Sequence, residues 1–510
     1  MVSKKQKDSI GERLISNTTY LFLDWFALAF FSFFFWAILG KTLNPYELGI
    51  VSTSINFVIL VTWVSTLGIT NALQKMIPEI RKSRGIKNVY SLIKNSSKLL
   101  SVSLFLLFII FSLLSYRLPI FLKIPNYVFL IIIFSIIIFP LYNFLGSILY
   151  GLQNMKLLFI TDSFQIIIRI ILTAVLIFIG LSFFAPLIAF SLGYFFIIFF
   201  RFKSEYFTEK TKFSYKKLFF YSFPALVSNI ANALTTNGQY IILTVLKNFE
   251  ITGIFTISFT ITSIIGVIMY TMNSALFPII SSLSIDKKTR KKQGYLIGLV
   301  LRYGLFLIIP ASLLLVLFSR YAILLFSKPE FLPSTQYFPI LVTAAIFLGI
   351  GNVFLPNLYA IGKPIQHRNI TIVSSLCFLA TSIILTNYFS ALGLSFSFLI
   401  AMFLRFLRSF ICMRKYLKIN FFIKDVFKIS LSSLIIALVT IFLRTFVHDI
   451  FLLSLILPFI GIFYLVILLF MKFYRKEDIR ILKYFAKRIP ILRKIILSIS
   501  DFTENKGLKK

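Results

Sequence analysis

Charged and metal-binding residues are scarce in this 510-residue chain. Only 14% of its residues are charged, and Asp and Glu together number 17, whereas a soluble globular chain is closer to one quarter charged. The two cysteines, Cys377 and Cys412, do not form a disulfide framework, and the two histidines, His367 and His448, lack zinc-motif spacing. There is also no Walker-type nucleotide loop. We therefore expect no metal and no cofactor.

Hydrophobic residues make up 58% of the chain and aromatic residues 17%. A water-soluble fold of this size cannot bury so much apolar surface. Apolar stretches recur from Leu14 to Met471, which indicates that the lipid bilayer is the solvent. The first stretch follows the basic segment Met1–Arg13 and lasts about 25 residues, which is too long for a signal-peptide core, so we expect a retained first helix.

The lengths of the apolar stretches predict an all-α, polytopic membrane protein with about 14 transmembrane helices, because one crossing needs about 20 apolar residues. We place these helices near residues 15–40, 48–72, 99–122, 127–150, 158–181, 184–202, 218–246, 251–280, 295–318, 336–361, 366–389, 391–413, 427–447 and 450–472.

The formal net charge of +36 would suit a nucleic-acid partner, but the positions of the basic residues argue against one. They cluster between apolar segments, without an RNA-binding or zinc-finger signature. The clusters fall in alternate connections: 4–7, 75–87, 201–217, 287–292, 414–424 and the tail from 472. The positive-inside rule makes that side cytoplasmic. We therefore expect no nucleic-acid partner, a place in the cytoplasmic membrane, and both termini inside the cell.

A six-helix unit occurs twice along the chain. The segment Asn44–Ile50 after the first helix is matched by Asn248–Ile254 after the seventh, and in both a Glu precedes a Gly at the start of an apolar run. An offset of six helices makes the two lobes parallel, as in many transporters that move one bundle against the other. The predicted domains are an N-lobe (1–203), a C-lobe (204–413), two further helices (414–473) and a basic tail (474–510). The tail reads equally well as an amphipathic helix on the anionic inner leaflet or as a solvated segment.

Five ordered motifs carry a family resemblance over nearly the whole chain. They are Leu43–Gly49 with Ser65–Ile69 and Pro78–Glu79; Tyr221–Pro224; Thr252–Phe255 running to Ala275–Pro278; Leu325–Phe331; and Tyr359–Pro364 with Leu392–Gly393. Taken together, they resemble the polysaccharide and oligosaccharide-lipid flippases of the MOP superfamily, relatives of the peptidoglycan lipid flippases and of the MATE drug exporters.

The resemblance implies two six-helix lobes around a central cavity, two extra C-terminal helices, and outward movement of a lipid-linked glycan by alternating access. One departure concerns the seventh helix. Many relatives have an acidic residue partway along it, whereas this chain has Asn237-Gly238. An ion-coupling role at that position is therefore in doubt.

Polar and charged residues within the predicted helices are candidates for a substrate cavity, because such residues are costly in a membrane unless they face a cavity or a partner. Several recur at i, i+3 and i+7, on one helical face. The candidates are Asn17, Asp24, Asp162, Gln165, Arg169, Asn229, Asn232, Gln239, Asn273 and Arg405. Instead of lining a cavity, the amides could form hydrogen bonds between helices, and Arg405 could extend to the inner membrane–water interface.

The expected roles follow from the substrate that the resemblance implies. A glycan joined to its lipid by phosphate or diphosphate would favour a cationic cavity, and arginine binds phosphate through two parallel hydrogen bonds. Arg169 is the candidate for that contact, and Asp24 could pair with a cation or with Arg169. Asp162, two turns from Arg169, could instead be its structural partner.

A flippase for a lipid-linked oligosaccharide is therefore the leading hypothesis, with membrane lipids as partners and with a coupling ion left open. A cation-coupled exporter of drugs or metabolites is the alternative from the same superfamily. A membrane-embedded glycosyltransferase or polymerase is disfavoured, because the outer loops are short and show no paired carboxylates. The chain is thus expected not to be an enzyme.

Overall fold

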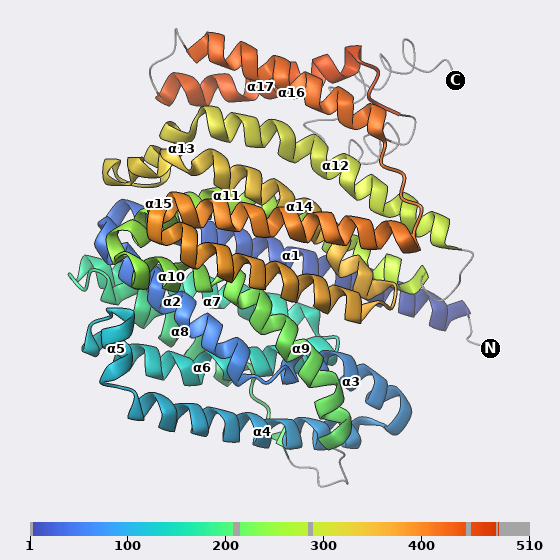
Figure 1. Cartoon of the computed structure of the whole chain (residues 1–510). Coiled ribbons are helices and arrows are strands. Elements are labelled where there is room, and N and C mark those ends of the chain that lie inside the picture. Colours follow the sequence, from blue (N-terminus) through green and yellow to red (C-terminus); the bar gives the residue numbers. More distant parts are fainter. Residues whose placement is uncertain (1–3, 208–214, 284–288, 445–449, 476–477, 479–510) are drawn as a thin grey trace.

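The computed structural model describes residues 4–207, 215–283, 289–444, 450–475 and 478. In this part of the chain the regular structure is entirely helical, as predicted, and long helices lie side by side (Figure 1). Twelve of the described helices are long and apolar enough to cross a membrane. One of them, α15 (Pro364–Tyr416), is two helices joined at Ser390, and α17 (Ile450–Phe470) adds a further apolar helix. Counted in this way, the described residues hold fourteen apolar helices, which agrees with the predicted number of about 14.

The first lobe contains the helices α1 to α8. Their bounds are α1 Lys4–Thr42, α2 Pro45–Ser65, α3 Ile69–Arg84, α4 Ile86–Leu113, α5 Arg117–Leu122, α6 Asn126–Gly151, α7 Met155–Phe178 and α8 Phe184–Arg201. A short 3-10 helix, η1 (Ser204–Phe207), follows. A capping box fixes the start of α2, since the Asn44 side chain accepts from the Glu47 N–H (2.9 Å) and Glu47 accepts from the Asn44 N–H (3.1 Å).

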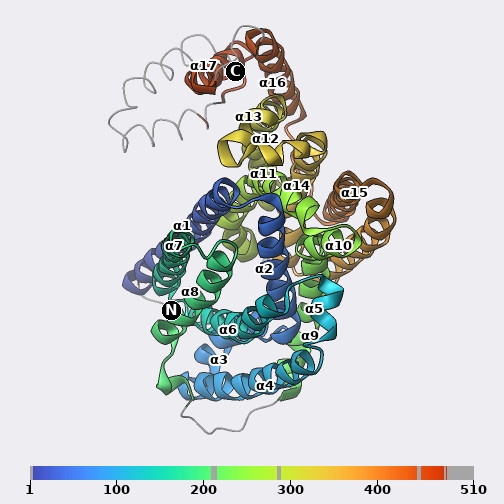
Figure 2. The same ribbon diagram turned by 90° about the vertical axis from the view of Figure 1, so that its left-hand side faces the viewer.

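The second lobe contains α9 to α15, and two further helices follow it. The bounds are α9 Tyr215–Thr236, α10 Gly238–Leu246, α11 Phe249–Leu283, α12 Arg290–Leu317, α13 Ser319–Phe326, the 3-10 helix η3 Pro329–Gln336, α14 Phe338–Ala360, α15, α16 Ile423–Arg444 and α17. Seen along the helix axes, α16 and α17 lie beside α12, at the edge of the molecule (Figure 2).

Three predicted helix boundaries were wrong. The predicted helix 48–72 is broken at Leu67 and Gly68, which both have positive φ angles, and the chain continues as α3 to Arg84. The predicted helix 218–246 is divided at Asn237 into α9 and α10. The helix predicted from residue 99 begins at Ile86 and ends at Leu113, before the separate α5. The amphipathic tail predicted over 474–510 lies largely outside the described residues.

The two repeated segments pack against each other at the end of the bundle opposite the N-terminus. A Cβ added to Gly49 would lie 1.9 Å from the Phe249 carbonyl oxygen, and one added to Gly253 would lie 1.8 Å from the Pro45 carbonyl oxygen. Only glycine permits so close a backbone approach. The Glu–Gly landmarks that identify the repeat in the sequence therefore form the contact between α2 and α11.

Polar contacts between the two lobes add to the contact between α2 and α11. The Thr53 and Thr244 hydroxyls are 2.7 Å apart, and Asn237 Nδ2 donates to Asn56 Oδ1 (2.7 Å). Lysines at helix ends also cross from one lobe to the other. Lys41 donates to the Leu324 carbonyl (2.6 Å), Lys328 to the Thr42 carbonyl (2.8 Å) and Lys123 to the Lys247 carbonyl (2.8 Å). The lobes are thus closed against each other at this end.

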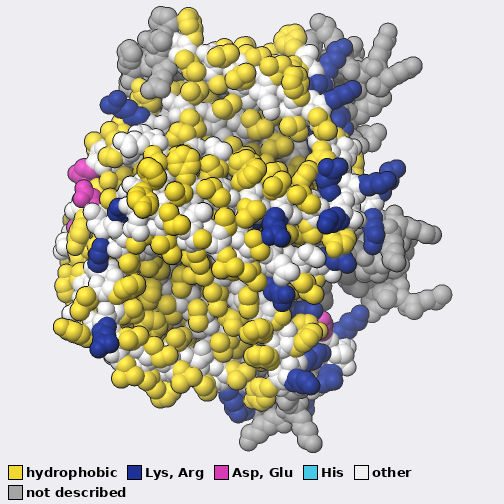
Figure 3. Space-filling model, in the orientation of Figure 1, with side chains coloured by type: hydrophobic (Ala, Val, Ile, Leu, Met, Phe, Trp, Pro, Cys, Tyr) yellow, Lys and Arg dark blue, Asp and Glu magenta, His cyan; other side chains and the backbone are white. Residues whose placement is uncertain are grey.

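Lys and Arg side chains gather at the other end of the bundle, where the N-terminus and the α3–α4 junction lie (Figure 3). Exposed examples from four connections are Arg81, Lys82, Arg84, Lys87, Lys216, Lys217, Lys291, Lys292, Arg414 and Lys415. We call this the basic end.

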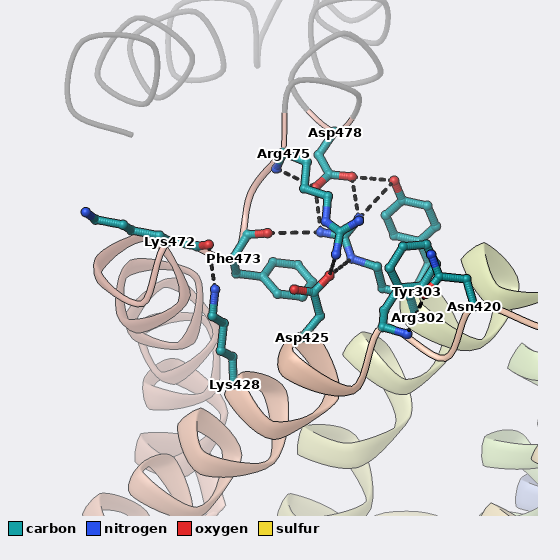
Figure 4. Close-up of polar contacts among 10 residues, drawn as sticks. Arg302, Tyr303, Asn420, Asp425, Lys428, Lys472, Phe473, Arg475 and Asp478 are labelled. Atoms are coloured by element: carbon teal, nitrogen blue, oxygen red, sulfur yellow. Dashed lines mark hydrogen bonds and ion pairs between the residues drawn. The ribbon is translucent and has the colours of Figure 1, made fainter. Parts of the chain in front are cut away.

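A buried ion cluster attaches α16 and the segment after α17 to α12 at the basic end (Figure 4). The guanidinium of Arg302, which is 1% exposed, contacts Asp425 through Nε (2.7 Å) and Asp478 through both Nη atoms (2.8 and 2.7 Å). Arg475 contacts Asp425 (2.6 Å), and Tyr303 donates to Asp478. The charges of the two arginines and the two carboxylates thus balance. The cluster holds the C-terminal helix pair to the second lobe.

The stability that Asp478 provides should be independent of pH down to acid conditions. Burial alone would raise the pKa of Asp478, but hydrogen bonds from Arg302, Tyr303 and the Arg475 N–H hold it below its ordinary value of 3.8. A carboxyl whose pKa is lower in the folded than in the unfolded protein stabilises the fold at pH values above its unfolded-state pKa. This contribution is lost as the pH falls through the folded-state pKa. The melting temperature difference between wild type and Asp478→Asn should be constant from about pH 8 to about pH 5 and shrink only below about pH 4. A difference that vanished near pH 6 would contradict the pairing.

Candidate substrate cavity

A cavity of about 590 Å³ lies between the two lobes, in the half of the bundle nearer the basic end. The first lobe contributes residues from α1, α3, α6, α7 and α8, and the second lobe contributes residues from α11 and α14. Helix breakers lie in its wall, including Pro356 within α14. The cavity is therefore located where relative movement of the lobes would reshape it.

Aromatic and amide side chains dominate the lining. The aromatic residues are Phe22, Trp25, Phe139, Tyr142, Tyr150, Tyr194 and Tyr270. Gln74, Asn143 and Asn273 supply amides, and Ser147 and Ser274 supply hydroxyls. The Trp25 and Tyr270 rings, one from each lobe, meet edge to face with centroids 5.1 Å apart. Such a surface offers apolar faces and hydrogen-bonding groups to the same ligand.

The one ion pair in the described lining joins α7 to α8. Arg201 binds Asp162 through Nη2, and Tyr142 from α6 donates to the same carboxylate. Arg201 also donates to the Thr161 hydroxyl (3.0 and 2.8 Å) and to the Tyr142 carbonyl (3.3 Å). Gly146 leaves room for it, since a Cβ there would lie 2.7 Å from Arg201 Nη1. Arg201 is only 2% exposed, so it is a structural partner of Asp162.

Asp24 on α1 is the third charged residue in the described lining. It is buried, its carboxyl is hydrogen-bonded to Asp162 although its Oδ1 has no partner, and it interacts electrostatically with Arg201. Arg201 and Asp162 are paired, and Asp24 lies beside this pair as a third ionisable group. The described lining thus holds one arginine, which is already paired with Asp162, and the cationic cavity stays a prediction.

An apolar groove of about 630 Å³ adjoins the cavity, and Phe22 lines both. It runs between α1 of the first lobe and α10, α11 and α12 of the second. Its wall includes Phe26, Phe30, Phe33, Trp36, Ile264, Val267, Met272 and Leu307. Phe30 and Phe33, both from α1, thus line this groove.

Of the predicted site residues, the structure brings Asp24, Asp162 and Asn273 together in the cavity lining. Asn273 also accepts from Asn357 on α14 (2.7 Å). Gln165 and Arg169 are buried next to Asp162 on α7, outside the described lining. Arg169 lies over the Phe35 ring (4.2 Å to the centroid). The proposed pairing of Arg169 with Asp162 is wrong, because Arg201 occupies that place.

The other candidates lie away from the described cavity lining. Asn229 donates to Asn71 across the lobes (2.8 Å), Arg405 donates to Asn232 (3.0 Å), and Gln239 donates to the Thr236 carbonyl (2.8 Å). Asn17 lies on α1, two turns before Asp24, and is absent from the described lining. Asn229 and Asn232 therefore form hydrogen bonds between helices, which was the alternative role for the amides.

Sequence reasoning missed Arg201 and most of the aromatic lining. Arg201 follows an apolar run and was grouped with the basic residues of the next loop, and only the packing of α8 on α7 reveals its partner. The chain has 23 tyrosines, so tyrosine content alone does not indicate Tyr142, Tyr150, Tyr194 or Tyr270. One usable signal was the repeated placement of an aromatic residue beside a polar one, as in Asp24-Trp25 and Tyr142-Asn143.

Comparisons with known proteins agree with this architecture. The lipid II flippase MurJ in an inward closed conformation superimposes with a TM-score of 0.70 at 18% identity, covering 88% of this chain and 97% of that one. An inward-facing multidrug resistance MATE family transporter of the MOP superfamily gives 0.62 at 14% identity, covering 78% and 94%. The Vibrio cholerae MATE transporter VcmN in its bent form gives 0.55 at 16% identity, covering 80% and 97%. These likenesses show the fold.

The sequence comparisons give the family. No curated protein sequence is significantly similar to the chain. The profile of the polysaccharide biosynthesis protein family, however, matches residues 14–284. That match covers more than half of the chain, from α1 through the whole first lobe to the end of α11. This multi-pass membrane chain therefore belongs to the polysaccharide biosynthesis protein family.

Proposed function

We propose that this protein moves a lipid-linked oligosaccharide across the cytoplasmic membrane by alternating access, for the assembly of a surface polysaccharide or glycoconjugate. The observation that carries the proposal is the pairing of a polar, aromatic-lined cavity with an apolar groove that shares Phe22 with it. A lipid-linked glycan has the same two parts. Its sugars need hydrogen bonds and flat apolar faces, and its tail needs a hydrocarbon surface.

The arrangement of the lobes supports this reaction. The repeat contact at Gly49 and Gly253 closes the end opposite the basic end, while the cavity lies in the half nearer the basic end. If the basic end is cytoplasmic, a head group formed inside the cell would enter this state and leave after the lobes reverse their contact. The solved relative named as a lipid II flippase makes a lipid-linked substrate the first choice.

Export of a small organic cation is the second candidate, and Asp24 is the observation that favours it. A buried carboxylate oxygen without a partner attracts a cation. The cavity is nevertheless joined to the apolar groove, and a small cation does not need that groove.

The test is translocation in vesicles that contain the purified protein and a fluorescent lipid-linked oligosaccharide, followed by its accessibility to an external glycosidase. Wild type should make the glycan accessible to the glycosidase, and Tyr270→Ala should slow this at least about fivefold, because stacking and hydrogen bonding at one aromatic residue contribute about 1–3 kcal/mol. Tyr388→Ala is the matched control, since Tyr388 on α15 is 80% exposed. Uptake of a small organic cation without translocation of the lipid would instead favour the exporter.

A further inference from the structure

The first lobe contains a buried guanidinium without a counter-charge among the described residues. Arg169, near the middle of α7, is 6% exposed, and its Nε has no hydrogen-bond partner. The ion pairs of the described chain all use other arginines. Asp162, two turns away on the same helix, is already occupied by Arg201. A guanidinium does not lose its proton in proteins, so Arg169 keeps a positive charge that is costly to bury alone.

Two more hydrogen-bond donors without partners flank Arg169 on the same face of α7. Gln165 and Thr173 lie one turn to either side of it, and each is 1% exposed. Gln165 Nε2 and Thr173 Oγ1 have no hydrogen-bond partner. The three side chains thus form a row of donors, and buried polar atoms without partners mark a place for an ion or an ordered water.

The neighbouring helices enclose this row and leave space beside it. The guanidinium carbon of Arg169 lies 4.2 Å from the centroid of the Phe35 ring of α1 and 5.9 Å from that of the Phe190 ring of α8. Aromatic rings attract a cation but carry no negative charge. Gly193 of α8 faces the row, since a Cβ there would lie 3.3 Å from Gln165 Nε2 and 3.6 Å from Arg169 Cβ. The absence of a side chain at this position therefore keeps room next to the donors.

We propose that Gln165, Arg169 and Thr173 bind a small monovalent anion such as chloride. A water molecule could accept the same hydrogen bonds, but it would leave the charge of Arg169 unbalanced inside the membrane. One negative charge is sufficient, because the row holds one cation and two neutral donors. These residues lie outside the described lining of the substrate cavity. The anion therefore occupies a site of its own within the first lobe, whichever substrate the protein carries.

The experiment follows thermal unfolding of the full-length protein in detergent while sodium chloride replaces sodium gluconate at constant ionic strength. Wild type should melt at least about 2 °C higher in about 300 mM chloride than in gluconate, because an anion that binds only the folded state stabilises it. In Arg169→Gln this shift should vanish, because the charge is gone. Gln165→Leu and Thr173→Val should each require at least about fivefold more chloride for half of the shift, since each removes one donor.

The matched control is Arg414→Gln, because Arg414 is exposed and also lies over a phenylalanine ring, that of Phe410 (5.6 Å to the centroid). This variant should retain the wild-type shift. Equal melting temperatures of wild type in the two salts would overturn the site, and so would an undiminished shift in Arg169→Gln. A larger shift with sodium phosphate than with chloride would overturn the choice of a small monovalent anion. If Arg169→Gln does not fold, an unchanged chloride requirement in both Gln165→Leu and Thr173→Val would overturn the inference.

Discussion

Gly253→Ala is expected to prevent the two lobes from closing at the end opposite the basic end, and translocation should fall at least about tenfold. The added Cβ would lie 1.8 Å from the Pro45 carbonyl oxygen and 2.9 Å from the Gly49 nitrogen. Both neighbours are backbone atoms, so no side-chain rotation relieves the clash. Overpacking of this kind costs about 1–3 kcal/mol, and each 1.4 kcal/mol shifts an equilibrium about tenfold. Gly49→Ala should have the same effect, because its Cβ would meet the Phe249 carbonyl oxygen.

A single cysteine can report this opening. Thr53 is buried and hydrogen-bonded to Thr244 between the lobes. In a Thr53→Cys background with Cys377 and Cys412 replaced by serine, a membrane-impermeant maleimide should label slowly, and adding Gly253→Ala should speed labelling about tenfold. Gly461→Ala is the control, because a Cβ at Gly461 meets no atom within 4 Å. Unchanged labelling with full translocation in Gly253→Ala would show that this contact is not the gate.

The sequence was sufficient for the membrane architecture because the determinants are local. The length of each apolar run sets a crossing, and the clusters of Lys and Arg mark one end of the bundle. The break at Leu67 and Gly68 was not predictable in this way, because the apolar run continues through it. The break depends on packing between the lobes, since a Cβ on Gly68 would lie 2.2 Å from the Ser222 carbonyl oxygen of α9.

The site was predicted only in part, and for a related reason. Asp24, Asp162 and Asn273 were detectable because polar residues are rare and costly within apolar helices. Arg169 satisfied the same criterion, yet it lies over the Phe35 ring and outside the described lining. The criterion finds residues that avoid lipid, but it does not distinguish a cavity from a helix interface. Arg201, which settles the charge balance of the cavity, needed the packing of α7 against α8.

Arg302→Leu is expected to destabilise the protein by about 3–5 kcal/mol, because removing one partner of a buried ion pair leaves uncompensated charge. Asp425 and Asp478 would both remain buried, with only Arg475, whose side chain is 40% exposed, close to Asp425. The apolar contacts of α16 and α17 with α12, such as Tyr464 with Phe306 (5.5 Å between centroids), would then hold the helix pair without its ionic attachment.

Thermal unfolding in detergent, followed by the loss of the monomeric peak in size-exclusion chromatography, measures the effect of Arg302→Leu. Lys428→Met is the control, since half-buried Lys428 donates only to the Lys472 carbonyl (2.8 Å), and its effect should stay within about 0.5 kcal/mol. Adding Asp425→Asn and Asp478→Asn to Arg302→Leu should recover most of the loss, because the buried charges are then gone. If the triple variant is no more stable than Arg302→Leu, the cluster stabilises the helix pair through the shape of Arg302 rather than through its charge.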